Sequence, residues 1–231
     1  RGEIADPTEG IDQLGGFAPG RERPAPKTLY DRWILSRLAT TIAEVDAGIE
    51  NFRLGEAASA LYRFVWNELC DWYLELSKSA LYAKEGAPLA FESTRAILHH
   101  ALETTLRLLH PFMPFVTEEL WQKLPRRPAD PASIMVAPFP KAEGLADPAA
   151  EREMSALMEI VTAARTLRAE HNIPPAKRVP LVLRADPALA RALAQNHVRA
   201  IGDLVRAQVT VTAADGARPR GSAVAVASGI E

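Results

Sequence analysis

The sequence predicts a mainly α-helical protein, in which an antiparallel helix bundle is followed by a small α/β unit. Three observations support this fold class. Between residues 29 and 171, apolar residues recur every three or four positions over long stretches, which is the spacing of one helix face. The connections between these stretches are short, as in antiparallel bundles. Residues 172–231 instead contain short β-branched runs, which are typical of strands.

The first helix is predicted from about residue 29 to residue 51. Residues 1–27 precede it, and they are rich in glycine and proline and show no period, so we interpret them as a linker or irregular arm. The inward positions of the first helix are Ile34, Leu38, Ile42, Val45 and Ile49.

The second helix is predicted over residues 54–83 and ends before the turn at Gly86 and Pro88. Trp66 lies near the boundary of its apolar face, where packing is favoured over an exposed stacking role. The inward stripe comprises Leu61, Val65, Leu69, Trp72 and Leu76. The opposite, polar stripe comprises Arg63, Asn67, Asp71, Glu75 and Lys78.

Two further helices complete the predicted bundle over residues 28–125. The third covers about 90–109 and ends before Pro111, because proline removes a backbone donor and clashes with a continuing helix. Pro114 opens the fourth, which runs to about residue 124. The third helix turns Ile97, Ala101, Thr105 and Leu108 inward, and the fourth has Val116, Leu120 and Leu124 on one side.

The remainder divides into an extended connection, a fifth helix and a small unit. Residues 126–148 are proline-rich, with a short extended run at 133–137. The fifth helix spans about 149–171 and belongs to the bundle, together with the segment up to residue 175. Over residues 176–231, the patterns predict strands at 179–184, 208–213 and 223–227, with helices at 187–195 and 198–206 between the first two.

Composition excludes several classes of protein. The formal net charge of −2 gives no bulk attraction for nucleic acid, so any such contact needs a local patch. Cys70 is the single cysteine, which excludes an internal disulfide and suits a reducing compartment such as the cytoplasm. No apolar run reaches the roughly 18–20 residues needed to cross a membrane.

The sequence offers no self-sufficient active site, metal site or cofactor site. Adjacent His99 and His100 point about 100° apart on a helix, so they cannot chelate one ion. Cys70 lies mid-helix without a visible activating base. The pair Glu118 and Glu119 lies early in the fourth helix, where negative charge offsets the helix dipole.

A local basic segment remains as the candidate functional feature. Residues 161–206 hold eight arginines and lysines against three acidic residues. Arg165 and Arg168 are three positions apart and share a helix face, and Lys177 and Arg178 follow the end of that helix. Such an excess can neutralise phosphates, although charge alone equally describes a solvated helix face.

Five segments carry a resemblance to a known family. They are residues 31–38 (DRWILSRL), 60–76 (ALYRFVWNELCDWYLEL), 110–121 (HPFMPFVTEELW), 133–140 (SIMVAPFP) and 164–175, which contains ARTLRAE and IPP. In this order they resemble the anticodon-binding region of class I aminoacyl-tRNA synthetases for branched aliphatic amino acids. The first and third segments are shared loosely with the isoleucyl enzymes, whereas the stretch from Trp66 to Tyr73 is similar to the valyl-tRNA synthetases. The resemblance covers residues 28–231.

The resemblance implies the fold of the class I anticodon-binding domain and a role in docking the anticodon stem-loop of a valine tRNA. The complete enzyme would attach valine to tRNA with ATP and Mg²⁺ in a catalytic domain preceding residue 1, and a coiled coil would follow residue 231. The His-Ile-Gly-His and Lys-Met-Ser-Lys-Ser signatures, the zinc-binding cysteines and the editing domain are absent from this sequence. We therefore expect this part of the enzyme to be inactive alone and to have no cofactor of its own. The complete enzyme is expected to be cytoplasmic and monomeric.

The candidate RNA contacts come from the polar stripe of the second helix and from the basic segment. Asn67 could read a base edge, and the cationic residues could hold phosphates or stack on bases. Two other interpretations stay open, namely an isoleucyl-type relative and a helical module that binds protein. The candidates are Arg63, Asn67, Arg165, Arg168, Lys177 and Arg178. Arg63 could instead pair with a surface carboxylate, and Asn67 could bond only water.

Overall fold

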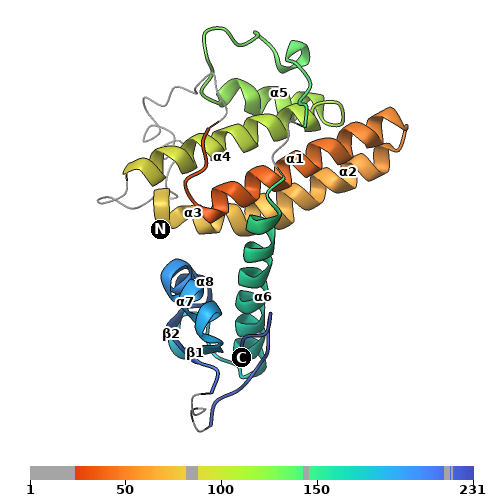
Figure 1. The fold of residues 1–231 in the computed structure, drawn as a ribbon. Coiled ribbons are helices and arrows are strands. Elements are labelled where there is room, and N and C mark those ends of the chain that lie inside the picture. Colours follow the sequence, from red (N-terminus) through yellow and green to blue (C-terminus); the bar gives the residue numbers. More distant parts are fainter. Residues whose placement is uncertain (1–23, 82–87, 143–145, 216–218, 220) are drawn as a thin grey trace, which may run out of the picture.

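The structure is a computed structural model that describes residues 24–81, 88–142, 146–215, 219 and 221–231. Helices form most of it, and a two-stranded sheet lies in a small unit near the end of the chain (Figure 1). The predicted fold class is confirmed. Most of the predicted arm, up to residue 23, lies outside the described residues.

Helix α1 (Leu29–Glu50) lies at the centre of the bundle and contacts α2 (Leu54–Tyr62), α4 (Pro88–Leu109) and α6 (Pro148–Glu170). A capping box starts it: the Thr28 hydroxyl accepts the Asp31 backbone N–H, and the Asp31 carboxylate accepts the Thr28 N–H. The predicted inward stripe is confirmed, since Ile34, Leu38, Ile42 and Val45 are buried and Ile49 is partly buried.

The predicted second helix is continuous but changes its winding. Helix α2 leads into the π-helical segment η2 (Arg63–Leu74) and then into α3 (Glu75–Leu81). A π-helix bonds each residue to the fifth along and so holds more residues per turn than an α-helix. The inward face is therefore Phe64, Leu69 and Tyr73, at spacings of five and four. Trp72, predicted to be inward, is only partly buried.

Helix α4 confirms its predicted inward stripe, whereas α5 (Pro114–Lys123) does not. Thr117 and Trp121 are the buried positions of α5, while Val116 and Leu120 of the predicted face are exposed. The correction has a packing reason. The large indole of Trp121 lies in a small cluster with Leu106 and Ile134, and this turns the helix by about one residue from the predicted face.

The predicted extended run at residues 133–137 is a single 3₁₀ turn, η3 (Ile134–Val136). The Ser133 hydroxyl caps it by accepting the Met135 N–H. The Glu118 carboxylate of α5 accepts the Ser133 hydroxyl and the Ile134 N–H, so these local bonds replace a strand ladder. Three hydrogen bonds, from the Gln122 amide, the Ser133 hydroxyl and the Ile134 N–H, lower the pKa of Glu118.

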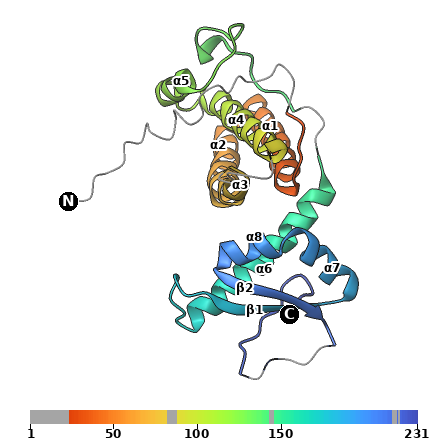
Figure 2. The ribbon, with the colours of Figure 1, turned by 90° about the vertical axis from the view of Figure 1, so that its left-hand side faces the viewer.

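Helix α6 connects the bundle to the α/β unit (Figures 1 and 2). Asp147 caps it through the Ala150 N–H, and Pro148 occupies its first turn. It contacts α1 and also α8 (Val198–Val205) of the small unit. One buried apolar cluster accordingly runs from Ile34 in the bundle to Ile201 in the α/β unit.

The α/β unit contains strands β1 (Val179–Ala185) and β2 (Ala207–Ala213), which pair in parallel with Val179 opposite Ala207. Helices α7 (Pro187–Asn196) and α8 form the crossover between the strands, as parallel pairing requires. The predicted third strand at 223–227 is not part of this sheet. Among the described residues, segment 223–227 makes one isolated antiparallel bridge, between Ala227 and Ile230, and residues 223–226 pair with no strand.

Candidate nucleic-acid interface

Arg63 and Asn67 project from the exposed side of η2, four residues apart. The Arg63 guanidinium lies 2.9 Å from the Glu44 carboxylate of α1, and both side chains are largely exposed. The surface pairing considered from the sequence therefore forms, although such an exposed pair contributes less than about 1 kcal/mol and opens readily to another anion. The Asn67 amide forms no hydrogen bond within the described part of the chain and remains accessible.

Tyr62 and Trp66 expose an aromatic pair beside these polar groups. Their ring centroids lie 6.3 Å apart, and the residues are 63% and 55% exposed. The prediction that Trp66 packs internally is wrong, because the inward face of η2 passes through Phe64 and Leu69 on either side of it. We call Tyr62, Arg63, Trp66 and Asn67 the η2 face. Exposed aromatic rings of this kind can stack on unpaired bases.

Arg165 lies where α6, α8 and η2 meet. Its guanidinium donates to the Leu204 carbonyl at 3.3 Å and lies 5.8 Å from the ring centroid of Trp72. Trp72 is thus engaged in a cation–π contact in addition to its partial burial. Because its hydrogen-bond partner is a carbonyl, the positive charge of Arg165 remains available to an anion.

Arg168 has a structural task as well as a charge. Its guanidinium donates to three backbone carbonyls, those of Arg206, Pro174 and Lys177, at 3.3, 2.8 and 2.9 Å. These bonds fasten the segment after α6 to the loop between α8 and β2. Carbonyl oxygens satisfy the guanidinium N–H donors without cancelling the positive charge. Arg168 therefore still contributes to a positive local potential while its N–H groups are hydrogen-bonded.

Lys177 and Arg178 lie on the exposed segment between α6 and β1. Arg178 approaches the Asp203 carboxylate at 3.4 Å, with both side chains more than half exposed. Lys177 contributes its carbonyl to Arg168, and its ammonium forms no ion pair within the described residues. We call Arg165, Arg168, Lys177 and Arg178 the α6 basic cluster.

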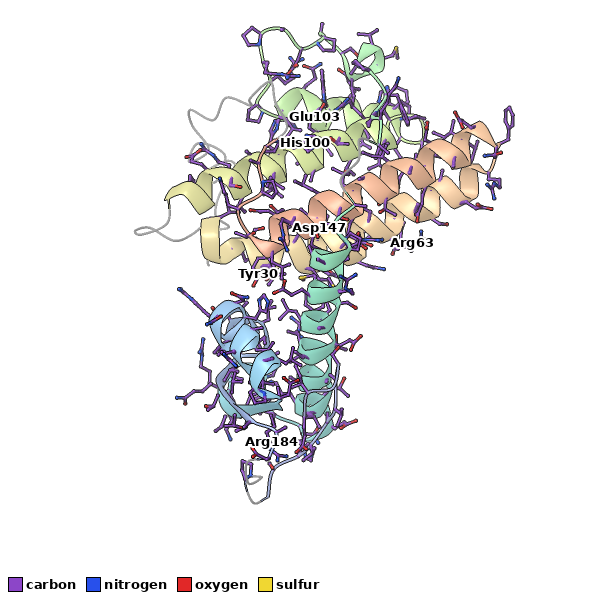
Figure 3. The ribbon with its side chains drawn as sticks, in the orientation of Figure 1. Tyr30, Arg63, His100, Glu103, Asp147 and Arg184 are labelled. Atoms are coloured by element: carbon purple, nitrogen blue, oxygen red, sulfur yellow. The ribbon has the colours of Figure 1, made fainter. Side chains whose placement is uncertain are left out.

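The six predicted contacts therefore form two groups. Arg63 and Asn67 belong to the η2 face, and the other four belong to the α6 basic cluster at the far end of α6. Arg165 joins the groups through its contact with Trp72, which lies on the same π-helix as Asn67. Figure 3 labels Arg63 of the η2 face on the helix bundle and shows α6 leading from the bundle to the α/β unit.

Comparison with known proteins identifies the family. Residues 31–183 match the model described as the anticodon-binding domain of tRNA ligase. The chain belongs to this family. It is 45% identical over 221 residues to a valine–tRNA ligase of Carboxydothermus hydrogenoformans, which covers 94% of the chain and 24% of that protein.

Two further relatives bear the same name. The valine–tRNA ligase of Geobacter sulfurreducens is 40% identical over 222 residues, covering 94% of the chain and 25% of the relative. That of Geobacillus kaustophilus is 44% identical over 173 residues, covering 74% of the chain and 19% of the relative. The chain thus spans about a quarter, or less, of the length of the curated relatives it matches.

The sequence pattern of this anticodon-binding domain did not identify Tyr62 as a candidate RNA contact. Tyr62 lies four residues before Trp66 and one before Arg63. An aromatic pair at this spacing, beside a polar stripe, is the signal that could have identified it. The change of winding in η2 hid the signal, because a regular α-helix was expected to turn Trp66 towards the core.

The remaining chemistry-bearing residues of the domain have structural surroundings. Burial, followed by the charge of Asp71, raises the pKa of the Cys70 thiol, which disfavours the nucleophilic thiolate. His197 is buried and lies 2.9 Å from the Glu153 carboxylate of α6. Within the described ranges, no three metal-ligating side chains cluster. No helix in those ranges has the length and apolar character that a membrane span needs.

Proposed function

We propose that this chain is the anticodon-binding part of a valine–tRNA ligase and that it binds the anticodon stem-loop of a valine tRNA. The observation that carries the proposal is the 40–45% identity to valine–tRNA ligases over 94% of the chain. The complete protein would join valine to its tRNA with ATP and Mg²⁺ in a catalytic domain of the same polypeptide, as a cytoplasmic monomer.

The geometry supports a division of labour at the RNA. Bases of a hairpin loop are unpaired, so they can stack on the exposed rings of Tyr62 and Trp66 while Asn67 reads a base edge. Phosphate contacts fix the position of an RNA without reading its sequence. The α6 basic cluster is suited to that task, because Arg165, Arg168 and Lys177 keep their charges free of carboxylates among the described residues.

Binding of anticodon hairpins tests the proposal. Three RNA hairpins would share one stem and differ only in the loop, which carries a valine anticodon, an isoleucine anticodon or a scrambled triplet. A lost base-edge hydrogen bond costs about 1–3 kcal/mol, so we expect the valine hairpin to bind about tenfold or more tightly than the others.

The other outcomes separate the competing interpretations. Preference for the isoleucine hairpin would assign the chain to an isoleucyl-type relative. Equal affinity for all three hairpins would contradict anticodon reading while leaving phosphate binding intact. Absence of binding at low salt, by a chain whose helical circular dichroism is intact, would favour the protein-interaction module.

A further inference from the structure

The last described residues form the tip of a β-hairpin. Ala227 and Ile230 exchange two backbone hydrogen bonds, of 2.9 and 2.8 Å, in antiparallel orientation. The two residues between them, Ser228 and Gly229, have φ values of 48° and 73°. Two consecutive positive φ values characterise the tight turn that joins neighbouring antiparallel strands. The chain therefore reverses at Ser228 and Gly229 and starts an outgoing strand at Ile230.

The outgoing strand engages β1 at its second residue. Glu231 exchanges two backbone hydrogen bonds with Arg184, of 2.7 and 3.0 Å. Their side chains also meet, with Nη1 of Arg184 2.8 Å from Oε1 of Glu231, as expected for directly opposed residues. Ile230 thus bonds the incoming segment and Glu231 bonds β1, which is the alternation of a strand that lies between two others.

The edge of β1 that Glu231 reaches is otherwise open along the described chain. Successive residues of a strand direct their backbone groups to opposite edges, so Val182 directs its N–H and C=O to the same edge as Arg184. Pro180, the next residue on that edge, has no N–H to leave unpaired. Apart from Glu231, no backbone group of the described residues bonds this edge.

An apolar cavity of about 500 Å³ lies beside this edge. Helix α6 supplies one wall, β1 supplies a second, and the incoming segment of the hairpin supplies a third. The residues that line it include Ala163 and Leu167 of α6, Leu181 and Leu183 of β1, and Ala225 and Ala227 of the incoming segment. Of the two β1 residues, Leu183 is part of the buried apolar cluster and Leu181 packs against it.

This inference rests on the proposed function: we propose that, in a complete valine–tRNA ligase that continues past Glu231, the next residues form a strand in this open edge and fill the cavity. Two observations select this occupant. Curated relatives are about four times as long as this chain, and Glu231 is already bonded to the edge, so the next residues are covalently directed along it. The segment 223–227 and the new strand then join β1 and β2 in a four-stranded sheet.

The two bonded pairs fix the register of the proposed strand. Antiparallel pairing from Glu231 and Arg184 places the second residue after Glu231 opposite Val182, and the first and third opposite Leu183 and Leu181. Opposed residues share one face of a sheet, so the first and third residues point into the cavity beside Leu183 and Leu181. We therefore assign apolar side chains to these two positions.

Hydrogen exchange at one amide tests this inference. Two chains would be extended after Glu231 by four residues of equal composition, Val-Thr-Val-Thr or Thr-Val-Thr-Val. The first places valine in the cavity and the second places threonine there. We expect exchange of the Val182 N–H to slow at least about tenfold in the first chain, because that amide then donates to the added strand. Exchange in the second chain should stay close to that of the unextended chain.

Two results would overturn the proposal: unchanged exchange at Val182 in both extended chains, or equal slowing in both. A Val182→Pro variant gives an independent measurement. The Val182 N–H points away from β2. A proline at this position therefore keeps the β1–β2 ladder intact and removes only the hydrogen-bond donor at the open edge. We expect the Val-Thr-Val-Thr extension to raise Tm in the parent chain and not in this variant. An equal rise in both would contradict strand addition.

Discussion

The hydroxyl of Tyr73 donates a hydrogen bond of 2.8 Å to the carboxylate of Asp31, and both residues are 0% exposed. Asp31 lies in the first turn of α1 and Tyr73 in η2. The same carboxylate accepts the Thr94 hydroxyl of α4 at 3.3 Å and the Thr28 N–H of the capping box at 3.2 Å. One buried acceptor thus ties three helices together and closes the start of α1.

Tyr73→Phe should destabilise the chain by about 1.5–3 kcal/mol, which is the range for a hydrogen bond to a charged group. The ring and its packing are retained, so the change isolates the hydroxyl. Tyr62→Phe is the matched control, because Tyr62 is exposed, and we expect a change within about 0.5 kcal/mol. Urea denaturation measures both. Equal effects of the two substitutions would show that the buried hydrogen bond contributes nothing specific.

Alkaline pH should destabilise the chain through Tyr30 and Tyr73. Burial raises the pKa of Tyr30 to about 12, with a further contribution from Glu153. Burial, and then the charge of Asp31, raise the pKa of Tyr73 well above its usual value of 10.0. The folded state holds these protons more tightly than the unfolded state does, so their contribution is complete below pH 10 and is lost as pH rises above it.

Urea midpoints at about pH 9 and about pH 11 measure this dependence. The parent chain should lose more stability between the two values than the Tyr30→Phe/Tyr73→Phe double variant, whose folded state has no such protons to retain. An equal loss in both chains would assign the alkaline sensitivity to other groups.

At Gly48, α1 packs closely against Ala57 of α2. A Cβ atom at this position would lie 2.9 Å from the Ala57 Cβ, so Gly48→Ala should cost about 1–3 kcal/mol through overpacking. Gly55→Ala is the control within α2, where an added Cβ meets nothing within 4 Å. It should stabilise by up to about 1 kcal/mol, because alanine favours the helix. Thermal unfolding of both variants compares them, and shifts of the same sign would contradict the packing account.

The elements of the fold were predictable because their burial follows simple periods. Ile34 to Val45 in α1 and Ile97 to Leu108 in α4 repeat at helical spacing and are buried as predicted. The π-helical winding of η2 left no mark in the residue pattern, so Tyr73 was missed and Trp66 was placed wrongly.

Tertiary partners decided the other corrections. Trp121 turned α5 away from its predicted face by packing with Ile134, and Glu118 held the run at 133–137 in a 3₁₀ turn. For the candidate site, charge counting found the α6 basic cluster. It could not reveal that Arg168 fastens three backbone carbonyls, since those acceptors come from separate segments of the chain.

Lys177→Gln should weaken binding of the anticodon hairpin and reduce the salt dependence of that binding. Each phosphate contact contributes about 0.9 to the slope of log affinity against log salt on duplex nucleic acid, and about 0.7 on single strands. We expect Lys177→Gln to reduce this slope by the amount of one phosphate contact. Lys141→Gln is the matched control, because Lys141 is also an exposed lysine but lies in the connection before α6. Filter binding across a salt series compares the variants, and identical slopes for both would remove Lys177 from the interface.

Cross-linking of a bound hairpin tests the placement of the RNA most directly. A hairpin carrying 4-thiouridine in its anticodon loop would be irradiated with the chain, and the cross-linked peptides would be identified by mass spectrometry. We predict cross-links to the η2 face, between Tyr62 at the end of α2 and Asn67 in η2. Phe115 on α5 and Met135 in η3 are also exposed apolar side chains, so cross-links confined to these residues would contradict the assignment of the η2 face.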